Sequence, residues 1–453
     1  MQIVEKEIKI PYSRDAAGLI GHFKKEVESK VPSGEIPIRF VVTESTRGGF
    51  KCEIGTLACE GDQDWTQVSS IFDFKKRPFE NTREFNVVLL VPTGIGAEIG
   101  GHAGDAGPLA RLMASVCDNL ITHPNVVNAS DINELPDNGL YVEGSLITRL
   151  LMGEISLKKV RSNRVLLVME KHPCGPYFED KSINAFNAAR ATLGMEGTQI
   201  IRLDEALDMR ALWSNAGRAV GRIDHFDRLA AVIDREEGKF DALALATRIQ
   251  VPMEFHTEYY NEEIDMVNPW GGVEAMLTHT VSTLYNIPSA HAPMMTDQST
   301  MNLDLGVVDP RKSAEIISEA FLHCVLKGLH RSPQVITDPL LINHPDFISA
   351  SNVSALVIPD GCMGLPTLAA LSQEIPVIVV KGNKNQARVK LEPFFSKARH
   401  FYTVENYFEA AGLLMSLRAG VSVESLQRPL KKSLVVSSLD PAMVSSQSNG
   451  SGR

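Results

Sequence analysis

Short runs of Val, Ile and Leu, separated by helical segments, constrain the fold of this chain more than any other feature. The runs are apolar on both faces: NVVLLVP, NRVLLVME, GTQIIRL, DALALATRI, LDLGVVD, SALVIP and IPVIVVKG. Such runs are typical of the central strands of a parallel sheet, which is covered on both sides. Helical patterns alternate with them, as in GPLARLMASVCDNL and VEAMLTHTVSTLY. This alternation predicts an α/β fold with doubly wound, Rossmann-like layers.

One segment of the chain occurs twice. ITHPNVVNASDINEL (121–135) and INHPDFISASNVSAL (342–356) align without a gap and share Ile, His, Pro, Ala, Ser and Leu. Around each copy the predicted order is strand, helix, His-Pro segment, strand ending in an acid-Gly pair, helix and strand. We therefore predict an internal duplication, in which two related α/β halves, 85–240 and 241–430, face each other across a cleft.

The two ends of the chain differ from this main body. Within residues 1–84, QIVEKEIKI alternates like a strand, DAAGLIGHFKKEVESKV has helical spacing, and IPIRFVVTESTRGGFKCEIGTLACEG fits two strands around a Gly-Gly turn. We expect a small α+β N-terminal domain there. Residues 431–453 are small and polar, which predicts a disordered tail.

Composition narrows the class of partner. The net charge of −10 argues against a nucleic-acid or anionic-membrane partner. No apolar run approaches the roughly 18–20 residues that span a bilayer, and MQIVEKEIKIPYS lacks the regions of a signal peptide. The six cysteines are scattered without a CxxC pair, as expected for reduced thiols. We expect a soluble, cytoplasmic protein that binds a small molecule, with a homo-oligomer left open.

The densest glycine cluster, VPTGIGAEIGGHAGDAGP, lies between a predicted buried strand and a helix. Glycine permits positive φ and close backbone approach, and the first turn of a helix presents N–H groups that bind anions. The cluster is neither a P-loop nor a clean GxGxxG. We predict that it binds the anionic end of a substrate, with His102 as a catalytic candidate; the alternative is a tight turn with solvated side chains. The binding candidates are Thr93, Gly94, Gly96, Glu98, Gly100 and Gly101.

The first His-Pro segment follows a predicted strand, at the edge of an α/β sheet where ligands bind. His123 precedes a proline, so its backbone is extended, and a histidine there suits a general base near neutral pH. Asn125 and Asn128 accompany it as binding candidates. The alternative is a histidine that fastens a turn, with Asn128 as a local cap.

The acid-Gly pairs Glu143-Gly144 and Asp360-Gly361 each end a predicted strand. Two halves that face each other would bring Glu143 and Asp360 together as a pair of carboxylates for acid/base catalysis, with Gly144 and Gly361 beside the substrate. Cys362 lies near a helix N-terminus, where the pKa of a thiol falls, and is a candidate nucleophile. The alternative for Cys362 is a small residue that fits a tight loop.

Other polar clusters are less specific. His172 in HPCGPYFED, Trp270 as a stacking surface and Glu274 in a first helical turn are added as binding candidates. His256 and Glu258 lie among several carboxylates and are weak candidates for a divalent metal, since no HExxH motif is present. The alternative is an acidic loop with solvated side chains.

A resemblance adds a family but no reaction. VPTGIGAEIGGHAGDAGPLARLMASVCDNLITHPNVVNASDINELPDNGLYVEGS, with NPWGGVEAMLTHTVS, IPSAHAPM and PDGCMGLPTLAAL, resembles an uncharacterised family of bacterial and plastid proteins, a domain of unknown function. The resemblance covers about residues 87–383. Separately, IPDGCMGLPTLAALSQEIPVIVVKGN is similar to the donor-binding turn of two-domain nucleotide-sugar transferases and epimerases.

Together these patterns favour an enzyme that acts by acid/base chemistry on a small polar metabolite, similar to an amino acid or hydroxy acid, in the cleft. Lyase, isomerase and group-transfer reactions all fit. One alternative is a nucleotide-sugar or nucleotide-dependent transferase that uses the Cys362 loop. Another is a non-catalytic sensor that closes on its ligand. The cofactor stays open, with a divalent metal and a nucleotide as the two candidates.

Overall fold

The structure, a computed structural model, describes residues 1–13, 18–46, 48–59, 68–261, 266–301, 303–395, 398–433 and 435. The chain divides into two units, Met1–Ala411 and Gly412–Arg453, and the first contains the site described below. The predicted α/β fold is confirmed. Most of the predicted tail, 431–453, lies outside the described residues.

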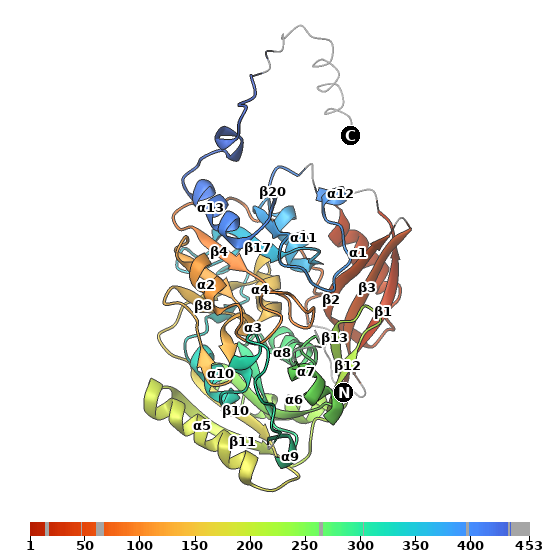
Figure 1. The fold of residues 1–453 in the computed structure, drawn as a ribbon, viewed down its shortest axis with the longest axis vertical. Coiled ribbons are helices and arrows are strands. Elements are labelled where there is room, and N and C mark those ends of the chain that lie inside the picture. Colours follow the sequence, from red (N-terminus) through yellow and green to blue (C-terminus); the bar gives the residue numbers. More distant parts are fainter. Residues whose placement is uncertain are drawn as a thin grey trace. The chain divides into compact units, whose positions relative to one another are not determined.

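Six strands form a parallel sheet in the order β20-β19-β17-β4-β5-β8. Their bounds are β4 (Asn86–Leu89), β5 (Asn119–Thr122), β8 (Gly139–Tyr141), β17 (Val353–Pro359), β19 (Val377–Val380) and β20 (Phe401–Val404). The chain runs outward from β4 on one side and from β17 on the other, so the strand order reverses between these two strands (Figure 1). Ligands commonly bind beyond the carboxyl ends of strands at such a reversal.

A second, ten-stranded sheet has the order β11-β10-β14-β12-β13-β1-β3-β2-β18, with β15 paired to β14. Its strands are β1 (Gln2–Pro11), β2 (Glu35–Thr46), β3 (Gly49–Ala58), β10 (Arg164–Glu170), β11 (Glu196–Leu203), β12 (Met209–Trp213), β13 (Ala219–Ile223), β14 (Ala242–Gln250), β15 (Ser289–Met294) and β18 (Met363–Gly364). β1 pairs with β13 through Ile3 and Ile223. Strands from both sides of the predicted boundary at residue 84 therefore belong to one sheet.

Helix α8 (Gly271–Tyr285) is packed inside the molecule. It contacts β2, β13 and β15 of the ten-stranded sheet, and it also contacts α4 (Gly144–Leu151). α4 in turn packs on α11 (Leu365–Ser372), which contacts β17 and β19 of the parallel sheet. Because α8 has neighbours on several sides, even its polar residues Thr278 and Thr280 are buried. These two threonines therefore face the interior and not bulk solvent.

The structure describes ten further α-helices and three 3₁₀ turns. The helices are α1 (Leu19–Glu28), α2 (Gly107–Ala114), α3 (Pro124–Val127), α5 (Tyr177–Leu193), α6 (Phe226–Arg235), α7 (Met253–Tyr260), α9 (Gln298–Met301), α10 (Phe321–His330), α12 (Glu392–Phe395) and α13 (Tyr407–Arg418). The 3₁₀ turns are η1 (Ser313–Glu315), η2 (Ala350–Asn352) and η3 (Val423–Leu426). Two short ladders pair β6 (Asn128–Ala129) with β7 (Ile132–Asn133) and β9 (Ser156–Lys158) with β16 (Gln334–Ile336).

Two related Rossmann-like halves that face each other are not confirmed. Both copies of the repeated segment contribute to the same parallel sheet, because the first begins within β5 and the second ends within β17. Their histidines also differ: His123 is buried, whereas His344 is exposed in a turn. β4 lies between the strands of the two copies, so both copies belong to one sheet and not to two separate layers.

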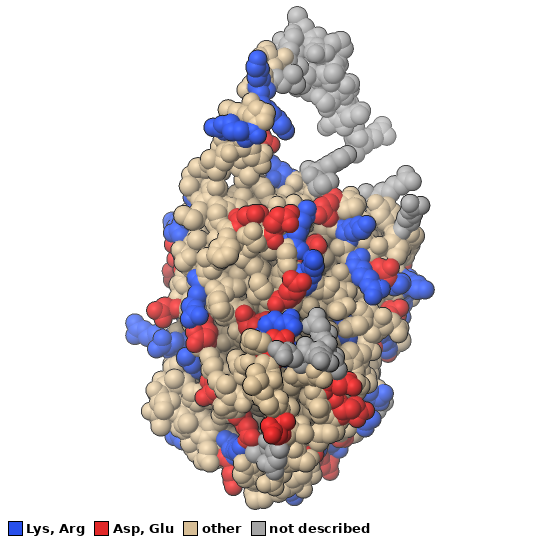
Figure 2. Space-filling view, in the orientation of Figure 1, with Lys and Arg blue, Asp and Glu red and all other residues tan. Residues whose placement is uncertain are grey.

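The charged residues on the surface do not indicate which class of partner the protein binds. Basic and acidic residues are interspersed among uncharged ones on the face that Figure 2 shows. No helix in the described part of the chain combines the length and the apolar character needed to cross a bilayer. The predicted partners and the predicted location therefore stay predictions.

Candidate active site

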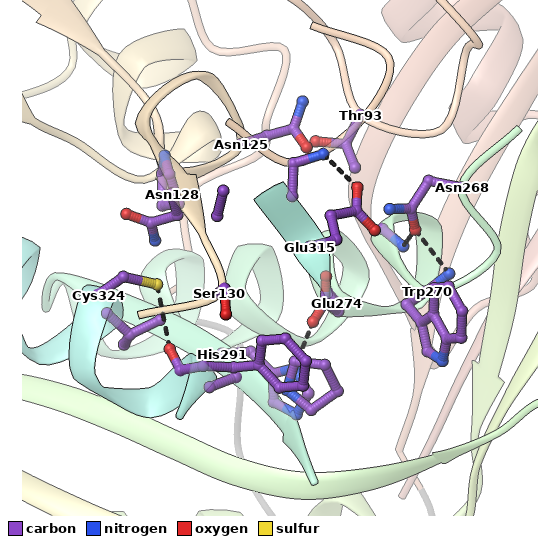
Figure 3. A pocket seen from close by; sticks show the side chains of 18 of the residues that line it. Thr93, Asn125, Asn128, Ser130, Asn268, Trp270, Glu274, His291, Glu315 and Cys324 are labelled. Carbon is purple, nitrogen blue, oxygen red and sulfur yellow. Dashed lines mark hydrogen bonds and ion pairs between the residues drawn. The ribbon is translucent and has the colours of Figure 1, made fainter. Parts of the chain in front are cut away.

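A cavity of about 430 Å³ lies beside α8. Five residues on one face of that helix line it, at the i, i+3, i+4, i+7 and i+8 positions that share a helix face: Gly271, Glu274, Ala275, Thr278 and His279. Loops that follow β4, β5 and β8 form a second wall, and β15 with the segment from Met295 to Glu319 forms a third (Figure 3). The helix thus presents its polar side chains to an interior space.

Glu143 is the N-cap residue of α4 and also holds a histidine. Its carboxylate accepts hydrogen bonds from the backbone N–H groups of Ser145 at 2.8 Å and Leu146 at 3.3 Å, and its Oε1 is hydrogen-bonded to Nδ1 of His279. Burial alone would raise the pKa of Glu143, but the charge and hydrogen bond of His279, with the Ser145 hydrogen bonds, lower it overall. The charged carboxylate therefore keeps the proton of His279 on Nδ1.

The other ring nitrogen of His279 is left open. No hydrogen bond among the described residues uses its Nε2, and the residue lines the cavity. An imidazole whose Nδ1–H is held by a carboxylate presents a lone pair on Nε2, which is how a general base is arranged.

In His123 the hydrogen-bonded nitrogen is Nε2, whereas in His279 it is Nδ1. The backbone N–H of Val91 donates to Nε2 of His123 at 3.2 Å, so Nε2 is the acceptor and the proton of the neutral ring lies on Nδ1. Burial lowers the pKa of His123 to about 4, although the nearby charge of Glu143 opposes the shift. At neutral pH His123 is therefore an uncharged hydrogen-bond donor that lines the same cavity.

A second carboxylate–imidazole pair lines the cavity of about 430 Å³ (Figure 3). Nδ1 of His291, on β15, lies 2.9 Å from Oε1 of Glu274, on α8. Nε2 of His291 lies 2.8 Å from Oγ1 of Thr247. Both nitrogens of His291 are used, so this histidine orients Glu274 and is not itself an open base.

Glu315 is another carboxyl group in the cavity wall, and it is buried. Its Oε1 accepts hydrogen bonds from the backbone N–H of Ala103 at 2.6 Å and from the hydroxyl of Tyr259 at 2.9 Å. That hydroxyl lies 2.8 Å from Nδ1 of His102. Burial raises the pKa of Glu315 to about 7, against the two hydrogen bonds that favour the charged form. Glu315 can therefore give or take a proton near neutral pH, and Tyr259 connects it to His102.

A smaller cavity of about 160 Å³ adjoins the larger one. The two share the lining residues Thr93, His123, Gly144, Ala275 and His279. The open base and the neutral donor therefore both lie where the two cavities meet.

The glycine loop after β4 is fastened to the protein through its backbone. The N–H groups of Glu98, Ile99 and Gly100 donate to protein acceptors at 3.0, 2.9 and 2.7 Å. Gly94, with φ +74°, lies so close to the neighbouring strand that a Cβ would be 2.8 Å from a backbone oxygen of Ala219. These amides are occupied and are not free to hold the predicted anion. Thr93 lines both cavities, and the loop residues that line neither are Gly94, Gly96, Glu98, Gly100 and Gly101.

Several other predicted residues reach the cavities. The larger one is lined by His123, Asn125, Asn128, Glu143, Gly144, His256, Trp270 and Glu274. The smaller one is lined by Gly361 and Cys362. Burial raises the pKa of the Cys362 thiol to about 12, so it is protonated at neutral pH and is a poor nucleophile.

Asp360, His172 and His102 also lie outside the lining of both cavities. Asp360 lines neither, and its Oδ1 accepts a hydrogen bond from the backbone N–H of Gly361 at 2.9 Å. The structure therefore does not bring Asp360 together with Glu143, since β4 and β5 lie between the strands that precede them. His172 is buried, with its Nε2 3.0 Å from the carbonyl oxygen of Met295.

The weak metal candidates are not brought together. Glu258 is exposed on α7, whereas His256, two positions earlier, is buried, and residues two apart on a helix face different ways. Within the described ranges no three His, Cys, Asp or Glu side chains are placed to hold a metal ion. Nε2 of His256 has no hydrogen-bond partner among the described residues.

Sequence reasoning missed His279, His291 and Glu315 as site residues. A signal for His279 existed, because Gly271, Glu274, Thr278 and His279 share one face of a single helical stretch. The other two are joined to the cavity by contacts between segments far apart in the chain, and no local pattern marks them.

The fold and site define an α/β protein with a polar cavity built on carboxylate–imidazole pairs. The chain belongs to the family described as "Protein of unknown function (DUF3326)", whose model matches residues 86–427. This confirms the resemblance drawn from the sequence. A protein named uncharacterized lipoprotein from Synechococcus sp. is 32% identical over 347 residues, which are 76% of this chain and 94% of that protein. No solved structure matches the chain.

Proposed function

We propose that this protein is an enzyme that transfers a proton on a small polar metabolite bound where the two cavities meet. His279 is the general base, Glu143 holds it, and His123 is the hydrogen-bond donor to the reacting group. The observation that carries the proposal is the contrast between the two histidines: Nε2 of His279 is open, whereas Nε2 of His123 is occupied by Val91.

The reaction that suits this pair is removal of a proton from a carbon next to a carbonyl or carboxyl group. The C–H bond breaks, the proton passes to Nε2 of His279, and the electron pair moves onto the oxygen of the substrate. The Nδ1–H of His123 donates to that oxygen as its negative charge develops. Glu143 stabilises the imidazolium that His279 becomes.

The larger cavity contains carboxyl groups that can return a proton to the substrate. Glu274 and Glu315 both line it, and the pKa of Glu315, raised by burial to about 7, suits an acid that protonates a second position. Return of the proton to another atom gives isomerisation, and loss of a neighbouring group gives elimination. Both outcomes begin with the same base and the same donor.

Hydrogen–deuterium exchange at carbon tests this proposal. The full chain is incubated in D₂O with a panel of amino acids, 2-hydroxy acids and 2-keto acids, and loss of each C–H signal is followed by proton NMR. The wild-type protein is expected to exchange at least one compound, and His279→Gln is expected to stop the exchange. His344→Gln is the control, because His344 is exposed and lines neither cavity, and its rate should equal that of the wild type.

Two results would contradict the proposal. Exchange in His279→Gln at the wild-type rate would remove the base. A compound that binds but keeps every C–H proton after long incubation would indicate a non-catalytic binding protein instead.

A further inference from the structure

Three arginines with largely buried side chains line the smaller cavity. Arg39 comes from β2, Arg149 from α4, and Arg218 directly precedes β13. Their side chains are only 10%, 9% and 1% exposed. No Asp or Glu among the described residues lines this cavity. Segments that are far apart in the sequence therefore converge to place positive charge around one small space.

The carboxylates that pair with these arginines lie behind the cavity wall. Arg39 pairs with Glu5 at 3.1 Å, Arg149 with Glu154 at 3.2 Å, and Arg218 with Glu53. A guanidinium has five N–H donors. Among the described residues no hydrogen bond uses Nη2 of any of the three arginines. Each arginine is thus fixed from behind and keeps donors for a ligand.

The charge of Arg149 is only partly balanced. Burial raises the pKa of Glu154 to about 7, although the charge of Arg149 opposes the shift. Near neutral pH this partner is therefore protonated for part of the time. A buried cation without a full countercharge is unfavourable, and an anion in the cavity would restore the balance.

The rest of the wall is largely apolar. It includes Ile38, Phe40, Leu90, Ile358 and Leu365. A space of about 160 Å³ with such walls suits one small anionic group and a few carbon atoms. Bidentate recognition of a planar or tetrahedral oxyanion is what buried arginine provides.

We infer that the smaller cavity binds the anionic group of the ligand, a carboxylate or a phosphate, through Arg149, Arg218 and Arg39. The inference deepens the proposed function, because an anion held there places the adjacent carbon between His123 and His279, which line both cavities. The substrate class is then an anionic metabolite. The anion is held by arginine side chains and not by the glycine loop after β4.

Isothermal titration of the full chain tests the inference. The probes are inorganic phosphate and malonate, each titrated against chloride at equal ionic strength, so that the two arms separate a phosphate from a carboxylate. At least one probe is expected to bind, and Arg149→Met should weaken its binding by about tenfold or more, as expected for loss of a charge-assisted hydrogen bond. Arg111→Met is the control: Arg111 forms an exposed ion pair with Glu134 and lines neither cavity, so binding should not change.

A second variant guards against misfolding. Arg149→Lys keeps the charge and should bind the probe more weakly than wild type but more tightly than Arg149→Met. Absence of binding by both probes, or equal affinity in wild type and either Arg149 variant, would overturn the inference. The titration needs no turnover: if His279→Gln and wild type bind the anion alike while wild type exchanges no C–H proton, the proposed function fails and the anion site stands.

Discussion

At the scale of the residue, Glu143 joins two tasks that usually fall to different side chains. One of its oxygens caps α4 through Ser145 and Leu146, and the other holds His279. The cap fixes the position of the carboxylate, and the carboxylate in turn fixes the tautomer of the imidazole. The sequence marked Glu143 through its place after a strand, but its partner lies 136 residues away. Periodicity within a window cannot reveal such a pair.

Removing the charge of Glu143 separates these tasks. In Glu143→Gln the side-chain oxygen can still accept from the α4 backbone, so the melting temperature should change little. The neutral amide no longer stabilises the imidazolium of His279, and deuterium exchange of the substrate should fall by about 100-fold or more. A large loss of stability together with unchanged exchange in the folded fraction would show that Glu143 is only a helix cap.

Glu315 predicts a pH dependence of stability. Its pKa in the folded protein, raised by burial to about 7, lies above the ordinary 4.5. The folded state therefore binds the proton more tightly, and this contribution to stability is present below about pH 4.5 and is lost as the pH rises to about 7. Glu315→Gln stays neutral throughout. Its unfolding free energy relative to wild type should therefore rise by on the order of 3 kcal/mol as the pH rises from about 4.5 to about 7. Urea unfolding at pH 4.5 and pH 8 measures the difference; a difference that does not vary with pH would contradict the assignment.

At the scale of the element, most of the buried strands were predicted correctly, but one predicted strand does not form. The runs NVVLLVP, NRVLLVME and IPVIVVKG contain β4, β10 and β19, and SALVIP forms all of β17 except Val353. LDLGVVD forms no strand, and its Val307 is 96% exposed. That run has the composition of a buried strand but finds no neighbouring strand to pair with, and composition alone does not supply a partner.

The start of α8 sets the position of Glu274 and His279, and Gly272 permits it. A Cβ at Gly272 would lie 2.2 Å from the carbonyl oxygen of Ala219. Gly272→Ala should therefore cost about 1–3 kcal/mol of unfolding free energy, because backbone must move to relieve the clash. Gly21→Ala in α1 is the matched control, since its Cβ meets nothing within 4 Å, and it should stabilise the helix by about 0.5–1 kcal/mol. Chemical denaturation of both variants checks the sign, and equal effects would show that close approach at α8 is unimportant.

At the scale of the whole molecule, the order of strands was beyond the sequence. β4 pairs with β17 and β1 pairs with β13, and in both cases the two partners are far apart in the sequence. An apolar run indicates that a strand is buried, but it carries no information on which strand lies beside it. The repeated His-Pro segment therefore suggested two layers, although both copies serve one parallel sheet.

The pairing of β1 with β13 predicts that residues 1–84 stabilise the rest of the chain. Ile3, Ile38 and Leu57 from the N-terminal strands share a core cluster with Ile223 and Phe226. A chain that begins at residue 85 leaves that core open to water, so we expect it to lose cooperative thermal unfolding, even though the family match begins at residue 86. Circular dichroism measures this. A shortened chain that melts sharply at the wild-type temperature would show that residues 1–84 are an independent domain.

The proposed mechanism requires that His123 is a neutral hydrogen-bond donor and that His279 is an open base, both where the two cavities meet. Nitrogen-15 NMR of histidine-labelled protein, assigned with His123→Asn and His279→Gln, observes both rings directly. We predict that His123 carries its proton on Nδ1 and stays neutral until the pH falls to about 4, while the Nδ1 of His279 remains protonated beside Glu143. A His123 that titrates at the ordinary pKa of 6.5, or that carries its proton on Nε2, would contradict the account.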